Sequence, residues 1–95
     1  MFGISIKRVE GHSMEPSIKA GSYCVFRRAR SYSVGDTVLI NHQEFGKIIK
    51  RVVTSDNNTV RVAGENINSV STERIGHVPN DRILGKLVKT FAEHS

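Results

Sequence analysis

The chain has 95 residues, with 38% hydrophobic and 24% charged residues and a formal net charge of +5. This balance is typical of one soluble globular domain and excludes collagen-like and disordered chains. No apolar run approaches the roughly 20 residues of a membrane-spanning helix, and no secretory signal opens the chain. We therefore expect a single cytoplasmic domain over residues 1–95, while peripheral association with a membrane stays open.

Apolar alternation and turn signals predict short strands along the whole chain. The predicted strands cover residues 4–9, 23–26, 36–40, 46–54, 59–63 and 82–91. The turn Asp56-Asn57-Asn58 joins two of them into a hairpin, and the last one has a short helix as its alternative. Residues 65–81 look like one long functional loop. The pattern predicts an all-β fold, either a small β-barrel or a coiled sheet.

Lys50 stands in the middle of the predicted strand 46–54, on the same face as Ile48 and Val52. If that face packs inward, desolvation disfavours the ammonium form and lowers the pKa of Lys50. A drop of two units would cost about 2.7 kcal/mol. A neutral amine is a general base that can take a proton from a hydroxyl. The structural alternative is a lysine that extends to the rim of the sheet.

Ser13 follows Gly11 and His12 at the end of the first predicted strand, where Pro16 marks a turn. Gly11 permits unusual dihedral angles, and backbone N–H groups at such a bend can face a developing oxyanion. A serine in a turn is more commonly a capping residue, so position alone does not make Ser13 a nucleophile.

Five motifs in a fixed order favour a catalytic role for Ser13 over a capping role. They are Gly-His-Ser-Met-Glu-Pro at 11–16, Gly-Asp-Thr-Val at 35–38, Ile-Lys-Arg-Val-Val at 49–53, Gly-Glu-Asn at 64–66 and Gly-His-Val-Pro at 76–79. Together they resemble the catalytic region of bacterial type I signal peptidases, and more broadly the Ser–Lys peptidase superfamily that includes the LexA-type self-cleaving repressors. The resemblance covers residues 8–88 and implies a signal-peptidase/LexA-like β-barrel domain.

The resemblance implies that Ser13 is the nucleophile and Lys50 its general base. Some signal peptidases carry a serine at the position of Gly11, so its absence here leaves the oxyanion to backbone N–H groups, including that of Ser13. By the same resemblance Met14 lines the substrate cleft, with a hydrophobic plug as its structural alternative. His12 adjoins the nucleophile and is assigned to site tuning or substrate binding.

The resemblance also implies supporting residues. Gly-Glu-Asn matches the family's Gly-Asp-Asn, so Glu65, next to Asn66, would pair with Arg51 and hold the Lys50 strand. In the following loop Arg74 matches the family's arginine, but Val70 replaces the serine that orients the lysine amine. Ser69 or Ser71 could supply that hydroxyl after a shift of one residue.

Only 13 residues separate Lys50 from Gly64, so we expect no inserted second domain of the kind found in many signal peptidases, and the sequence also predicts no membrane anchor. It looks more like compact soluble members such as nickel-type superoxide dismutase maturation proteases. These are implied to clip a short leader from a partner protein. We therefore expect a serine endopeptidase that acts in trans on a protein or peptide substrate.

Other chemistry has weaker support in the sequence. Cys24 lies inside a predicted strand, which favours a buried structural thiol. The four histidines show no short metal-ligand spacing, so we expect no metal and no cofactor. Two alternatives stay open: a non-catalytic β-barrel that binds peptides, and a nucleic-acid binder built on Arg27, Arg28 and Arg30.

Overall fold

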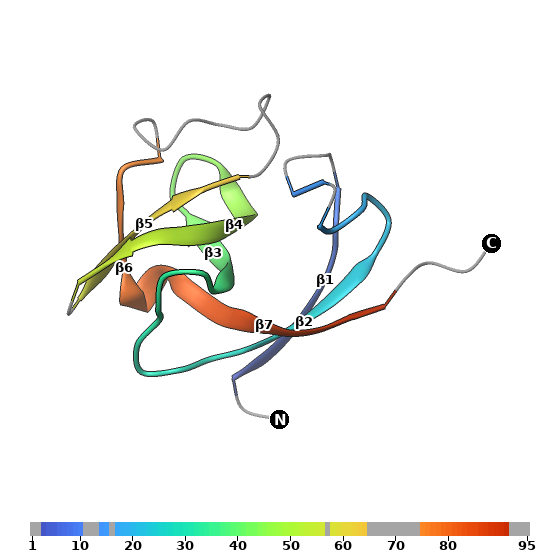
Figure 1. The fold of residues 1–95 in the computed structure, drawn as a ribbon, viewed down its shortest axis with the longest axis horizontal. Coiled ribbons are helices and arrows are strands. Elements are labelled where there is room, and N and C mark those ends of the chain that lie inside the picture. Colours follow the sequence, from blue (N-terminus) through green and yellow to red (C-terminus); the bar gives the residue numbers. More distant parts are fainter. Residues whose placement is uncertain (1–2, 11–13, 16, 57, 65–74, 92–95) are drawn as a thin grey trace.

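The computed structural model describes residues 3–10, 14–15, 17–56, 58–64 and 75–91 (Figure 1). Its elements are β1 (Ile4–Arg8), β2 (Tyr23–Arg27), β3 (Thr37–His42), β4 (Gly46–Ser55), β5 (Thr59–Ala63), β6 (His77–Pro79), the 3-10 helix η1 (Asn80–Arg82) and β7 (Ile83–Phe91). The six predicted strands are therefore present, with bounds within a few residues of those expected. The predicted all-β fold class is confirmed.

The strands form a seven-stranded antiparallel sheet in the order β1-β2-β7-β3-β4-β5-β6. Among the described strands, β1 and β6 lie at the two edges and do not pair with each other, so the sheet is coiled and not a closed barrel. Figure 1 shows β1 and β2 with the end of β7 on one side, and β3 to β6 on the other.

β7 connects these two parts of the sheet. It pairs with β2 on one side and with β3 on the other, so the short-helix alternative for residues 82–91 is wrong. β2 crosses close to Gly85, where an added Cβ would lie only 2.8 Å from the backbone N and C atoms of Arg27. Glycine thus allows a close approach that no other residue could match.

Two hydrophobic clusters hold the sheet together, and neighbouring residues of one strand enter different clusters. On β3, Val38 and Ile40 belong to the first cluster. This cluster also contains buried valines of the next three strands: Val52 of β4, Val60 and Val62 of β5, and Val78 of β6. Leu39 belongs to the second cluster, with Phe26 of β2 and Ile49 of β4. This is the alternation that a strand buried on both faces requires.

The predicted long loop 65–81 is wrong in its last part, because β6 and η1 lie there. β6 pairs Val78 with Val60 of β5. The strand escaped the sequence analysis because it is three residues long and contains Pro79. Proline removes a donor from the ladder, but an edge strand such as β6 tolerates that loss.

Candidate active site

Lys50 is buried in the middle of β4, with only 3% of its surface exposed. Its cross-strand partner is Val38 of β3, which is fully buried. Directly opposite residues in an antiparallel pair share a face, so Lys50 lies on the face of the sheet that carries the first hydrophobic cluster. Burial in this surrounding lowers the pKa of Lys50 below its ordinary value.

The rim position considered for Lys50 is therefore wrong. Lys47, three residues earlier on the same strand, is exposed, as lysines usually are. The two lysines differ in exposure because of their positions on the strand. Lys47 lies near the end of β4, whereas Lys50 lies between the buried Ile49 and Val52. A lysine kept in such a place without a structural reason is a candidate for chemistry.

The segment that carries Ser13 is anchored on both sides by backbone hydrogen bonds. Before it, the N–H of Val9 donates to the carbonyl of Ser22 at 2.7 Å, and the carbonyl of Val9 accepts the N–H of Gly21 at 2.8 Å. After it, the carbonyl of Met14 accepts the N–H of Ile18 at 2.8 Å. These bonds fix the chain where it enters and leaves residues 11–13.

Met14 connects this segment to β4. Its side chain is 1% exposed and belongs to the same hydrophobic cluster as Ile49. Met14, which follows Ser13 in the chain, and Ile49, which precedes Lys50, therefore pack in one hydrophobic cluster. This burial supports the plug role considered for Met14, whereas its place in the substrate cleft stays a prediction.

Several predicted site residues lie outside the residues that the structure describes. They are Gly11, His12, Ser13, Glu65, Asn66, Ser69, Ser71 and Arg74. Arg51 is described and half-buried on β4, opposite Thr37 of β3 and Ala63 of β5. Ala63 precedes Gly64 and Glu65 in the chain, so the pairing of Arg51 with Glu65 stays a prediction.

Cys24 is a buried thiol on β2 with no exposed surface. Burial raises its pKa, against a smaller lowering by its contact with the Thr90 hydroxyl, where Sγ and Oγ1 are 4.0 Å apart. A raised pKa reduces the thiolate fraction, so the structural role predicted for Cys24 is supported.

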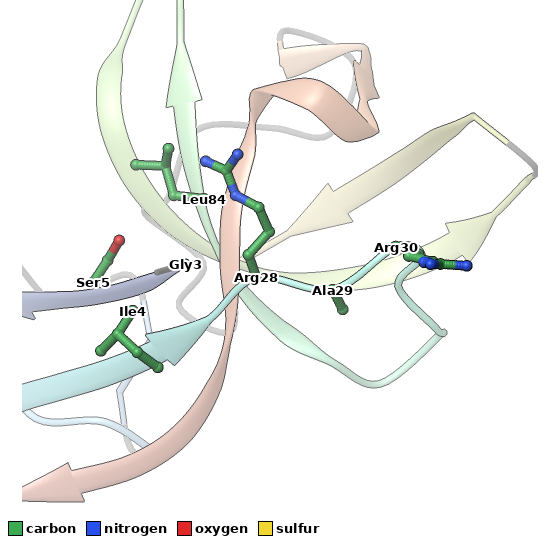
Figure 2. Close-up of a pocket in the computed structure, with 7 residues that line it drawn as sticks. All are labelled: Gly3, Ile4, Ser5, Arg28, Ala29, Arg30 and Leu84. Atoms are coloured by element: carbon green, nitrogen blue, oxygen red, sulfur yellow. The ribbon is translucent and has the colours of Figure 1, made fainter. Parts of the chain in front are cut away.

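The described surface includes two pockets that are lined by neither Lys50 nor Met14. The first has a volume of about 740 Å³ and is lined by Gly3, Ile4, Ser5, Arg28, Ala29, Arg30 and Leu84 (Figure 2). The second, of about 440 Å³, lies beside β6 and contains His42 and His77. The first pocket could not be predicted from the sequence, because its lining comes from three distant parts of the chain.

Within the described residues, no group of three or more His, Cys, Asp or Glu side chains is placed to hold a metal ion. His42 is instead used in the fold: its Nδ1 accepts the N–H of Glu44 at 3.1 Å, and its Nε2 lies 3.2 Å from the carbonyl of Ile75. No helix in the described part of the chain is both long enough and apolar enough to cross a membrane.

Comparison with known proteins gives one family. A family model described as Peptidase S24-like matches residues 4–88, which is nearly the whole chain. The matched range contains the Ser13 segment, all of β4 and the Gly-Glu-Asn stretch. A search of curated proteins found no match.

Proposed function

The chain belongs to the Peptidase S24-like family, and from this we propose that it is a serine endopeptidase with a Ser13–Lys50 dyad. The observation that carries the proposal is the burial of Lys50 on β4, which lowers its pKa. A buried amine with a lowered pKa is the base that a serine hydroxyl needs, because the neutral form can accept its proton.

The proposed reaction is acyl transfer. The neutral Lys50 amine takes the Ser13 proton while Oγ attacks the scissile carbonyl, which forms a tetrahedral oxyanion. Backbone N–H groups around Gly11 and Ser13 stabilise that oxyanion. Lys50 then gives its proton to the leaving amine. A water, deprotonated by Lys50, attacks the acyl-enzyme and releases the acid product with Ser13 restored.

The anchored flanks of residues 11–13 support this assignment. A nucleophile must be held close to its productive position, since small displacements cost large factors in rate. Val9 on one side and Met14 on the other are both buried in the second hydrophobic cluster, together with Ile49. This packing ties the Ser13 segment to the strand that carries the base.

We propose a substrate that is a separate polypeptide, from which the enzyme removes a leader or signal-type segment. β1 (Ile4–Arg8) lies before Ser13 in the chain. β1 is paired with β2 along its whole length, from Ile4 opposite Arg27 to Arg8 opposite Tyr23. Withdrawing β1 into the site would break this pairing.

Purified protein should therefore keep its full mass during long incubation at alkaline pH. Intact-mass spectrometry of the wild type beside a Ser13→Ala variant measures this directly. An N-terminal fragment that is lost from the wild type but kept by Ser13→Ala would contradict action in trans and indicate self-processing.

Cleavage should increase with pH. Because burial lowers the pKa of Lys50, the fraction of neutral amine rises at a pH below the ordinary value of 10.5. We expect kcat/KM toward a peptide library, followed by mass spectrometry, to rise into the mildly alkaline range. Cys24→Ser should leave this profile unchanged. A rate that is highest at acidic pH would assign the base to a carboxylate or a histidine.

A further inference from the structure

β1, β2 and β7 expose a face that combines apolar and basic side chains. The register of the three strands places on it Ile4, Ile6 and Arg8 of β1, Tyr23, Val25 and Arg27 of β2, and Lys86, Lys89 and Phe91 of β7. We call this set the outer face. The opposite face of the same strands carries Cys24 and Phe26, which are fully buried in the core. Figure 1 shows β1, β2 and the end of β7 together, on the side of the sheet away from β5 and β6.

Large apolar side chains on the outer face are exposed to an unusual degree. Ile6 has 69% of its surface exposed and Phe91 48%, and Ile4 and Tyr23 are also exposed. Single exposed apolar residues need no explanation, but neighbours on adjacent strands make a contiguous patch. Tyr23 is the cross-strand partner of Phe91, and Ile6 lies opposite Val25.

The charge of this face has one sign. The three strands contain five lysines and arginines and no aspartate or glutamate. Four of the five lie on the outer face: Arg8, Arg27, Lys86 and Lys89. The Lys89 ammonium lies 5.0 Å from the centre of the Phe91 ring, so cations and apolar surface are interleaved.

At its Ile4 end the outer face reaches the 740 Å³ pocket, since Ile4 lines both. The pocket is also lined by Arg28 and Arg30, and no carboxylate is among its lining residues. Figure 2 shows the Arg28 guanidinium and the Ser5 hydroxyl on the side of the sheet away from the Ile4 side chain, so these donors of the pocket are not part of the outer face.

We infer that the outer face binds an acidic, apolar segment of the protein substrate, outside the peptide bond that is cleaved. The inference rests on the proposed function for the presence of a protein substrate. Apolar residues of that segment would cover Ile6, Tyr23 and Phe91, and its carboxylates would face Arg27, Lys86 and Lys89. Charge complementarity selects the acidic partner.

The other occupants fit this surface less well. A second copy of the chain would place the four cations of one outer face against those of another, which is repulsive. A single-stranded nucleic acid could stack on Tyr23 and Phe91, but it would leave Ile6, the most exposed apolar residue of the face, without a matching aliphatic group. An acidic polypeptide satisfies both the charge and the aliphatic surface.

The position of the face suits a substrate contact. β1 extends about 13 Å from Ile4, beside the pocket, to Arg8, and the chain then continues toward Ser13. A substrate held on this face would thus lie along the strand that precedes the proposed nucleophile. Binding there would raise the local concentration of the cleavable segment at the site.

The test is a direct binding measurement with the Ser13→Ala protein, so its result does not depend on catalysis. The probe is a fluorescein-labelled peptide of about twelve residues, made of Glu, Leu and Phe, which spans about 40 Å when extended. Fluorescence anisotropy should show binding that weakens with added salt. Arg27→Glu should weaken it about tenfold or more, and Ile6→Ser by about tenfold.

Matched variants and other probes decide the outcome. Val34→Ser removes an apolar side chain of similar exposure, 64%, from a turn outside the face, and Arg82→Glu reverses an exposed cation on η1. Both should bind the peptide as the parent does. Equal losses in the controls, no binding of the peptide, or tighter binding of an oligothymidylate or of phosphatidylglycerol vesicles would overturn the inference. Absence of peptidase activity in the wild type, with peptide binding intact, would instead reject the proposed function alone.

Discussion

Replacing Lys50 with methionine should abolish peptide cleavage and stabilise the fold at the same time. Removing the base or the nucleophile of a peptidase lowers kcat by roughly 10⁴-fold or more, so Lys50→Met and Ser13→Ala should each fall to background. Methionine has a similar length without the charge, and it places an apolar group beside Val38 and Val52. We expect the free energy of unfolding to rise by roughly 1–2 kcal/mol at neutral pH.

The stabilisation produced by Lys50→Met should decrease as the pH rises. Because the pKa of Lys50 is lowered in the folded state, the unfolded chain binds more protons than the folded one between that lowered value and the ordinary 10.5. The stability of the wild type therefore rises with pH through this window. Lys50→Met lacks this dependence, so the difference in stability between the two proteins should shrink as the pH rises. Urea titrations of both proteins at neutral and alkaline pH measure it.

Lys47→Met is the matched control, because Lys47 lies on the same strand but is exposed. It should leave both cleavage and the pH dependence of stability close to those of the wild type. Lys50→Arg should be inactive and less stable, since a buried guanidinium keeps its charge and cannot act as a base. Substantial cleavage by Lys50→Met or Ser13→Ala would reject the dyad. A folded protein without activity in any form would favour the non-catalytic binding module.

The strands of this fold were predictable because each carries its own local signal. The hairpin of β4 and β5 is the clearest case, since the Asp56-Asn57-Asn58 turn separates two β-branched runs that pair with Val52 opposite Val62. The order of the strands was not predictable. β7, the last in sequence, lies between β2 and β3, and only contacts between distant segments decide that position.

The chemical character of Lys50 could be deduced from the sequence, but its burial could not. Alternation places Lys50 on a face with Ile48 and Val52, yet a strand with apolar residues on both faces does not tell which face is covered. The answer depends on Val38, which lies opposite Lys50 in the sheet and twelve residues before it in the chain. Likewise, the arginines near residue 28 were visible in the sequence, whereas the pocket that they form with Gly3 and Leu84 was not.

Gly85→Ala should destabilise the protein far more than the addition of one methyl group to a strand usually does. Gly85 is buried on β7, and a Cβ there would lie 2.8 Å from the backbone N and C atoms and 3.0 Å from the backbone O of Arg27. Backbone atoms cannot rotate away as a side chain can, so β2 or β7 must shift. Such overpacking costs about 1–3 kcal/mol, and we expect the upper end of this range.

The consequence should extend to the candidate site, because Gly85 also lies opposite Leu39 of β3, next to the partner of Lys50. Gly46→Asn is the appropriate control. Gly46 has a φ of +74° with open space around its Cβ position, and asparagine tolerates that conformation. Urea denaturation should show a small loss for Gly46→Asn and a large one for Gly85→Ala. Equal, small losses in both variants would mean that β2 does not approach Gly85 as closely as described, and that the connection between the two parts of the sheet is looser than the register indicates.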